Sequence, residues 1–423
     1  MRQAAENPVR LCERPIRVLT VTDPIELVSL DEDSYYQDPA GLFARLRESR
    51  PVAPVWMPGY GRAWLITRYE DVRAALTDPR LASKPRWEQG GGQSPADAAG
   101  GVHALLNIDP PDHTRLRRLL QKAFTPRRAV QLRPRAEEIA AGLLDEMAAG
   151  GDVIDLLDSY ARPFPITVIC ELLGIPVADR GWIWVKVTDY GKAGEELQRV
   201  PRELGAYFTG LIAAKRAEPG SDLLSALVHA HDGAGPEGVV QGGALTGTEL
   251  LSAAYHLVMA GFDTTVNLIA SGMLALLAQP GEMARLREDP SLLPAAVEEL
   301  ARFTSPVNHV TARFTTEDLP IGDVVIPAGE QVLVATGSAN RDPAQFAGPD
   351  RVDLGRDTSG HVAFGHGIHY CLGAPLARME AEVALGALLG RFRAISLVVP
   401  LEELRWRPVS LMNGLESLPV RLA

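Results

Sequence analysis

The chain has 423 residues, of which 46% are hydrophobic and 22% charged, and its formal net charge is −11. This composition is that of an ordinary globular protein and excludes a disordered chain. The negative charge predicts no nucleic-acid partner and no anionic membrane partner, and no apolar run approaches the ~20 residues that span a bilayer. We therefore expect a cytoplasmic protein.

The first part of the chain predicts a tail followed by a small helix and strands. Residues 1–30 carry scattered charges and no apolar run, so we expect an N-terminal extension before a single domain over residues 31–423. A helix begins near Pro39, and APVWMPG and AWLITR predict a strand pair. The segment Lys84–Gly101 is rich in Gly, Ser and Pro and predicts a loop.

The middle of the chain predicts helices, and the last part mixes short strands with two more helices. From Pro110 to about Ala278 the apolar residues recur every three or four positions, most continuously in ELLSAAYHLVMAGFDTTVNLIASGMLALLA. The connection HDGAGPEGVVQGGALTG predicts a surface loop. After the helix PAAVEELARF come β-like pieces, an irregular segment and a helix from Ala374. No repeat divides the chain, so the fold class is mainly α with a smaller β portion.

The stretch FGHGIHYCLG places Cys371 among glycines and directly before a helix, whereas Cys12 and Cys170 are expected to be buried thiols. A zinc site would need three or four Cys and His ligands, and the glycines have no role in it. A Cys/His hydrolase would need an oxyanion hole that the sequence does not display. A thiolate ligand of haem iron accounts for the sulfur, the glycines and the helix together.

This stretch resembles the signature F-x-x-G-x-[HR]-x-C-x-G of the cytochromes P-450, the haem-thiolate monooxygenases. The matching residues are Phe364, Gly367, His369, Cys371 and Gly373. The resemblance implies the single-domain cytochrome P-450 fold, a triangular prism of helices whose long central helix carries AGFDTT. It also implies haem b as cofactor, with Cys371 as the axial ligand of iron and Phe364, Gly365 and Gly373 beside the haem.

AGFDTT places an acid and two hydroxyls inside the most apolar helix, where they are costly unless hydrogen bonded. One interpretation is a capped or bent helix, and the other is a polar groove. The resemblance favours the groove: Asp263 and Thr264 would hold waters and deliver protons during dioxygen activation, and Ala260 and Gly261 would lie against the haem. Phe262 stands where related bacterial enzymes often have His.

Two further pairs are spaced to share a helix face. Glu299 and Arg302 are three residues apart and, taken alone, predict a common exposed ion pair. The resemblance implies instead a buried structural pair completed by a later arginine, for which Arg351 is preferred and Arg341 is the other candidate. His113 and Arg117 are four residues apart. The resemblance implies that these two bind one haem propionate, and that Arg313 and His369 bind the other.

The segment from Thr114 to Arg135 holds eight basic residues and no acidic one. It is either a solvated face or a docking patch for an acidic partner, and we leave both open. The resemblance implies a separate ferredoxin or flavodoxin with its reductase, which passes electrons from NAD(P)H. We expect a monomer.

The substrate pocket is predicted partly from helical spacing, which places His256, Met259 and Ala260 on the stripe that contains Thr264. The resemblance adds five residues: Val307, Asn308, Val310, Leu411 and Met412. Core packing is the other interpretation for Met259 and Leu411. A largely apolar lining with two polar groups fits a bulky oxygenated lipophile.

The overall pattern is most similar to soluble bacterial enzymes that tailor macrolides and other polyketides in antibiotic biosynthesis. We therefore predict hydroxylation or epoxidation of such a molecule. Relatives with these motifs oxidise terpenes, steroids or cyclic peptides, so these substrates stay open. Peroxygenation, oxidative coupling or mere haem binding are the rival functions, and retention of Asp263 and Thr264 argues against them.

Overall fold

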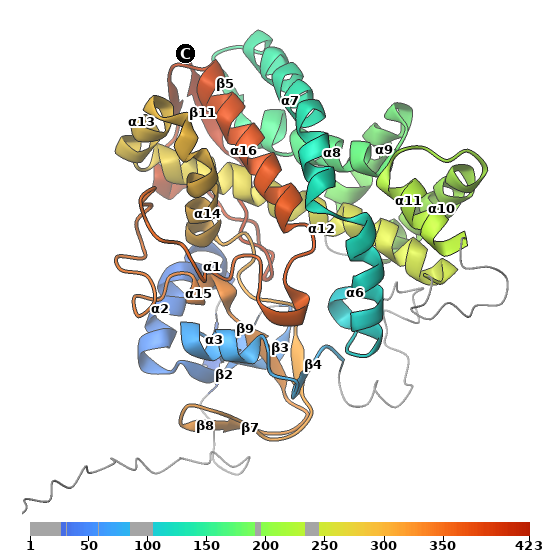
Figure 1. Ribbon diagram of the computed structural model, residues 1–423. Helices are drawn as coiled ribbons and strands as arrows, with labels where there is room; N and C mark the ends of the chain where they lie inside the picture. The colour runs from blue at the N-terminus through green and yellow to red at the C-terminus, as the bar shows by residue number, and fades with distance from the viewer. Residues whose placement is uncertain (1–26, 31, 58, 85–104, 191–195, 233–244) are drawn as a thin grey trace, which may run out of the picture.

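A strand-rich region and a larger helical region make up the molecule, and α12 runs through the helical region (Figure 1). The computed structural model describes residues 27–30, 32–57, 59–84, 105–190, 196–232 and 245–423. The described helices are α1 (Glu32–Gln37), α2 (Pro39–Ser49), α3 (Tyr69–Ala75), α6 (Asp112–Ala123), α7 (Pro126–Ala149), α8 (Pro163–Leu173), α9 (Val177–Tyr190), α10 (Glu196–Ala217), α11 (Leu223–Asp232), α12 (Gly247–Leu277), α13 (Pro280–Glu288), α14 (Leu293–Thr304), α15 (Thr336–Ala339) and α16 (Ala374–Arg391).

The strands form three sheets, in the orders β1-β2-β3-β9-β6-β4, β10-β11-β5 and β7-β8. Their bounds are β1 (Val28–Ser29), β2 (Val52–Met57), β3 (Gly61–Ile66), β4 (Leu81–Ala82), β5 (Val153–Asp155), β6 (Arg313–Thr315), β7 (Leu319–Ile321), β8 (Val324–Ile326), β9 (Gln331–Val334), β10 (Ile395–Leu397) and β11 (Pro419–Leu422). The predicted pair APVWMPG and AWLITR is confirmed as the antiparallel strands β2 and β3.

The six-stranded sheet buries both of its faces. Trp64 and Ile66 of β3 enter one apolar cluster, whereas Ala63 and Leu65 enter another on the opposite face. This follows from the two-residue period of a strand, which sends successive side chains to opposite sides. Packing on both faces of the sheet fixes the ends of the loops that lead away from it.

Helix α12 has 31 residues and begins with a capping box, in which the Thr246 hydroxyl accepts from the Glu249 amide and the Glu249 carboxylate accepts from the Thr246 amide. It packs against α8, α14, α10 and α16. Among the described residues, α12 alone is long and apolar enough to cross a bilayer, and 61% of its apolar window is buried inside the protein. This burial is typical of a central core helix.

Several predictions fall wholly or partly outside the described residues. The predicted loops lie largely in residues 85–104 and 233–244, and both ranges, like Cys12, are outside the described residues. The extension boundary at residue 30 stays a prediction, although Val28–Ser29 already pairs in parallel with Val55–Trp56 of β2. Cys170 is a buried thiol, as expected.

Candidate active site

The loop that carries Cys371 owes its shape to two glycines. Gly365 and Gly367 have φ angles of 74° and 71°, which side-chain-bearing residues rarely adopt. A Cβ on Gly367 would also lie 2.8 Å from the Leu76 carbonyl oxygen. The Cys371 amide donates to the Phe364 carbonyl at 2.8 Å, which closes the loop. The backbone conformation at both positions, and the tight packing at Gly367, therefore favour glycine.

Cys371 is exposed, although protein groups crowd around its thiol. Burial raises the pKa of the Cys371 thiol, and the backbone amides of Gly373 and Ala374 and the charges of Arg117 and Arg378 oppose that shift. A Cβ on Gly373 would lie 3.8 Å from the sulfur. In the part of the chain that the structure describes, no three His, Cys, Asp or Glu side chains form a metal site. Ligation of iron by Cys371 stays a prediction, and it would need no further protein ligand.

Four residues predicted to bind propionates meet in space. The rings of His113 and His369 lie 4.3 Å apart. Both ring nitrogens of His113 and the Nδ1 atom of His369 are buried without a hydrogen-bond partner. Burial, and then the positive charge of Arg313, lower the pKa of His369 to about 3, with smaller effects of His113 and Arg117 in the same direction. Arg117 Nη2 also reaches the Tyr370 carbonyl at 2.6 Å, which ties this cluster to the cysteine loop.

This propionate cluster (His113, Arg117, Arg313 and His369) has the chemistry of an anion site. Buried polar atoms are almost always hydrogen bonded, so three orphaned imidazole nitrogens need an explanation. The guanidinium groups of Arg117 and Arg313 place positive charge beside two imidazoles whose pKa values are lowered, and Arg suits a carboxylate best. The residues present therefore fit the two carboxylates of a haem.

Asp263 and Thr264 are half-buried on α12, between the buried residues Phe262 and Thr265. The Thr264 hydroxyl donates to the Ala260 carbonyl at 2.7 Å and the Thr265 hydroxyl to the Gly261 carbonyl at 3.1 Å, as Thr side chains do when they bend a helix. Ala260 is exposed in mid-helix. A Cβ on Gly261 would approach Ile169 of α8 to 3.3 Å, so Gly261 also allows the two helices to pack closely.

The Asp263 carboxylate has a partner that sequence reasoning missed. Arg407 Nη2 donates to both carboxylate oxygens, at 2.8 and 2.9 Å, and to Asn267 Oδ1 at 3.2 Å. Arg407 is 144 residues away in the irregular C-terminal segment. No periodicity or motif predicts such a contact.

A second missed residue is Glu380 of α16, which is 1% exposed. Both of its carboxyl oxygens lack a hydrogen-bond partner. Burial raises the pKa of Glu380 well above its ordinary value. The sequence predicts the helix from Ala374 that contains Glu380 and assigns this residue no role.

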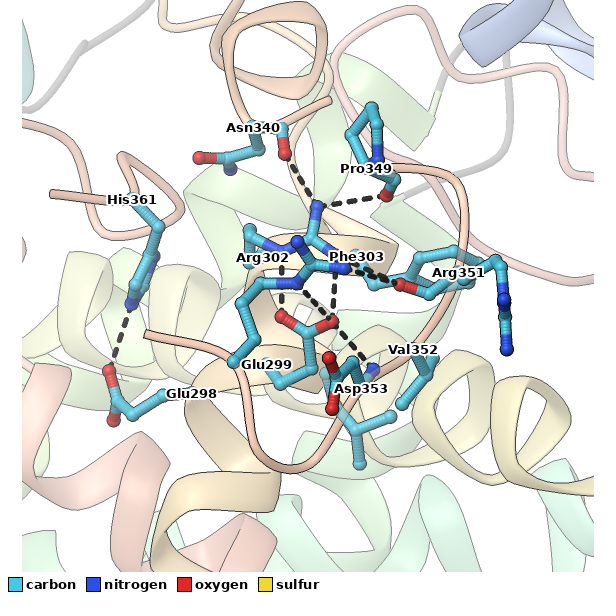
Figure 2. Close-up of polar contacts among 12 residues, drawn as sticks. Glu298, Glu299, Arg302, Phe303, Asn340, Pro349, Arg351, Val352, Asp353 and His361 are labelled. Atoms are coloured by element: carbon cyan, nitrogen blue, oxygen red, sulfur yellow. Dashed lines mark hydrogen bonds and ion pairs between the residues drawn. The ribbon is translucent and has the colours of Figure 1, made fainter. Parts of the chain in front are cut away.

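Glu299 and Arg302 form the predicted buried pair, as Figure 2 shows. Arg302 donates to both carboxylate oxygens at 2.6 and 2.8 Å, and its remaining nitrogen, Nη1, donates to the carbonyls of Asn340 and Pro349. Neither side chain is more than 1% exposed. All of this charge is hydrogen bonded, so the pair is structural rather than catalytic.

The prediction that Arg351 completes this buried pair was wrong. Arg351 contributes only its carbonyl oxygen, which accepts from Arg302 at 3.3 Å (Figure 2). The guanidinium that reaches Glu299 is that of Arg356, at 3.0 Å. Arg341 pairs instead with Asp350. The irregular segment turns between 351 and 356, and spacing along the chain does not show which arginine faces inward.

The predicted substrate residues gather in two places. His256 and Met259 are half-buried on α12, and the His256 Nδ1 atom bonds to the Ser252 carbonyl at 2.9 Å. Val307 forms a bridge with Met412, and the Asn308 amide donates to the Leu411 carbonyl at 2.9 Å. Val307 and Asn308, after α14, are thus joined to the predicted C-terminal residues.

Two of the predicted substrate residues have packing roles that the sequence did not show. Asn308 is 4% exposed, and its side-chain amide points to the Ser410 carbonyl. Val310 packs against the apolar cluster on one face of the six-stranded sheet. Both positions therefore help to fix the C-terminal segment and the sheet.

The basic segment divides into paired and exposed residues. Arg115 pairs with Glu249, Arg133 with Glu382, and Arg135 with Glu171. Arg118, Lys122 and Arg127 stay exposed. The solvated-face interpretation is thus too simple, because part of the segment anchors α6 and α7 to the rest of the protein.

Comparisons with known proteins agree on one class. A model of the family described as Cytochrome P450 matches residues 191–413. Cytochrome P450 107B1 of Saccharopolyspora erythraea is 47% identical over 414 residues, which cover 95% of this chain and 99% of that protein. The mycinamicin IV hydroxylase/epoxidase of Micromonospora griseorubida is 44% identical over 387 residues, with 90% and 95% covered. The structure of the tirandamycin C-bound P450 monooxygenase TamI aligns at TM-score 0.83 and 46% identity, covering 94% of this chain and all of that chain (100%).

The fold and these relatives define a haem-thiolate monooxygenase that depends on dioxygen. The chain belongs to the cytochrome P450 family. The predicted fold class, enzyme class and family resemblance are confirmed. One of these relatives is named for its action on mycinamicin IV, and the TamI structure contains tirandamycin C.

Proposed function

We propose that this enzyme hydroxylates or epoxidises a macrolide or related polyketide during the biosynthesis of a secondary metabolite. The support is the naming of the relatives: one acts on mycinamicin IV, and TamI binds tirandamycin C. Terpenes, steroids and cyclic peptides are the competing substrates, and oxidative coupling or peroxygenation are the competing reactions. The apolar residues Met259, Val307, Leu411 and Met412, with the neutral His256, suit a bulky molecule that carries few polar groups.

The observation that supports a haem in this enzyme is the propionate cluster next to the Cys371 loop. Haem b would be held by the Cys371 thiolate and by hydrogen bonds from His113, Arg117, Arg313 and His369, and the buried nitrogens of the two histidines lack any other partner. Phe364, Gly365 and Gly373 would lie on the sulfur side, and Ala260 and Gly261 on the opposite side. When bound, the haem supplies dioxygen binding and oxygen transfer, and thiolate donation favours O–O cleavage.

The chain's own chemical task is proton delivery. Asp263 pairs with Arg407 and reaches solvent on one side, since 26% of its side chain is exposed. Thr264 presents a hydroxyl one residue away, which can donate to an oxygen atom or hold a water in place. We assign Asp263 as the group that takes up a proton from solvent and passes it on, and Thr264 as the group that orders the last donor. A Thr264→Ala variant should keep haem and substrate affinity but divert electrons to hydrogen peroxide, and unchanged product yield would refute the assignment.

The electron donor is proposed to be a ferredoxin or flavodoxin that a reductase supplies from NAD(P)H. Arg118 and Lys122 on α6, and Arg127 at the start of α7, are exposed, and Arg117 links α6 to the cysteine loop. Ile368 and Tyr370 of that loop are 48% and 38% exposed. A basic rim around an apolar centre is complementary to an acidic protein. We further propose a monomer that works in the cytoplasm, in keeping with the burial of α12.

The test of the proposed function is a spectral titration of the purified enzyme with mycinamicin IV, tirandamycin C, a monoterpene and a steroid. A substrate shifts the haem iron from low to high spin, and the polyketides are expected to do so at lower concentration. Product analysis with a ferredoxin and its reductase then distinguishes hydroxylation from epoxidation. Tighter binding and turnover of the terpene or steroid would overturn the substrate class. A carbon-monoxide spectrum without the thiolate band would overturn ligation by Cys371.

A further inference from the structure

The C-terminal hairpin, residues 405–416, connects the substrate side of the site to the acid on α12. The Glu416 amide donates to the Arg405 carbonyl at 2.9 Å and the Arg407 amide to the Gly414 carbonyl at 2.8 Å. The tip of the hairpin holds Leu411 and Met412, which join the segment after α14. Arg407 lies near the base of the same hairpin, so its backbone is fixed by the hydrogen bond to Gly414 and by the neighbouring bridge between Trp406 and Leu415.

The contact between Arg407 and α12 involves two side chains of the helix and a glycine of the hairpin. Asp263 and Asn267 are four residues apart and therefore share one helix face, and the same Arg407 nitrogen reaches both. A Cβ on Gly414 would lie 2.3 Å from Asn267 Oδ1 and 2.8 Å from Arg407 Nη2. Only glycine at position 414 leaves room for this approach. The hairpin is thus shaped around the ion pair.

The geometry of the pair differs from that of a structural salt bridge. Nη2 makes all three contacts, while the Nε atom of Arg407 is buried without a partner. The usual two-nitrogen fork on a carboxylate is not formed. About a quarter of each side chain is exposed, at 23% for Arg407 and 26% for Asp263. The carboxylate is therefore held at one point and can turn about it.

We propose that Arg407 is a positioning residue for proton delivery, which holds the Asp263 carboxylate in place through Nη2 and the hairpin. The proposal rests on the proton-donor role assigned to Asp263 above. Without Arg407, Asp263 would lose its anchor and take other rotamers, and a mispositioned acid delivers protons poorly. Asn267 accepts a hydrogen bond from the same Arg407 nitrogen, and Gly414 leaves room for that contact, so both residues help to fix Arg407 in place.

The experiment uses the holoenzyme with a ferredoxin, its reductase and NAD(P)H, without added substrate. Dioxygen consumed in this way ends as hydrogen peroxide or as water, and water formation needs further protons. Three variants are compared with the native enzyme: Arg407→Met, Arg407→Lys and, as a matched control on the exposed neighbour in the same hairpin, Arg405→Met. The readouts are the carbon-monoxide spectrum, hydrogen peroxide per NAD(P)H and the solvent isotope effect on NAD(P)H oxidation.

Arg407→Met should keep the thiolate spectrum, raise the hydrogen peroxide per NAD(P)H several-fold and change the solvent isotope effect. Arg407→Lys should restore most of the native partition, because a single charged nitrogen suffices for the one-point contact. Arg405→Met should behave as the native enzyme. A native partition and isotope effect in the Arg407→Met holoenzyme would overturn the proposal, even if its thermal midpoint fell, because Arg407 would then be only structural.

An Asp263→Asn variant separates the two levels of inference. If Asp263→Asn leaves the partition unchanged, the proton-donor role fails and the role of Arg407 fails with it. If Asp263→Asn diverts electrons to peroxide but Arg407→Met does not, only the role of Arg407 is refuted. If both single variants and the double variant show the same partition, the two residues act as one unit, as proposed.

Discussion

Two groups of polar residues in this protein differ in how many of their buried atoms have hydrogen-bond partners. Around Glu299 and Arg302, the carboxylate accepts four hydrogen bonds, one of them from a second guanidinium, and backbone carbonyls accept from the rest of Arg302. In the propionate cluster, buried imidazole nitrogens have no partner at all. Because unpaired buried groups are costly, the first group is complete as folded and the second awaits a ligand. Hydrogen-bond satisfaction thus separates a structural network from a binding site.

The largest expected effect comes from breaking the complete network. Arg302→Met should destabilise the fold by about 3–5 kcal/mol, because it leaves the buried Glu299 carboxylate with too few donors. Arg356→Met should cost less, since Arg302 remains. The yield of protein with the thiolate carbon-monoxide band and the thermal midpoint measure both effects.

Arg351→Ala is the matched control for these variants, because only the Arg351 carbonyl takes part and the side chain is exposed. It should fold and bind haem as the native protein does. A defect as large as that of Arg302→Met would mean that the Arg351 side chain belongs to the network after all.

A change in the incomplete cluster should spare the fold and weaken cofactor binding. His113→Phe removes a side chain with no hydrogen-bond partner of its own, so protein yield and circular dichroism should stay native. Loss of one hydrogen bond to a charged propionate, worth about 1.5–3 kcal/mol, should speed haem release roughly tenfold to a hundredfold. Transfer of haem to an acceptor apoprotein measures the rate. Native release together with poor folding would show that His113 is a core residue.

Glu380 is a third case, because it is a buried carboxyl group that belongs neither to the Glu299 network nor to the propionate cluster. Its pKa is raised in the folded protein, so the unfolded state loses its proton first as pH rises above about 4.5. This contribution to stability is therefore present at low pH and declines by up to about 1.4 kcal/mol per pH unit above that value.

Glu380→Gln should remove this decline, so the variant should gain stability relative to the native enzyme as pH rises from 5 to 8. Urea midpoints of the two holoproteins at several pH values measure the difference. Parallel curves for the two proteins would mean that Glu380 is not protonated in the folded state.

Local pattern was sufficient wherever a function depends on neighbours in the chain. The glycines around Cys371, the four-residue step from His113 to Arg117 and the three-residue step from Glu299 to Arg302 each predict a shared loop or helix face, and the structure has these arrangements. The period of apolar residues likewise predicted α12, α14 and α16. Regular spacing determines direction within an element, so these parts needed no tertiary information.

Tertiary structure alone decided the partners that come from irregular segments. Arg356, rather than Arg351, completes the Glu299 network, and Arg407 reaches Asp263 across 144 residues. Neither segment has a period that says which side chain turns inward, so the surrounding packing decides it. The motifs of the sequence determined the family and predicted Cys371 as its iron ligand, whereas the contact between Arg407 and Asp263 depends on how the C-terminal hairpin packs on α12.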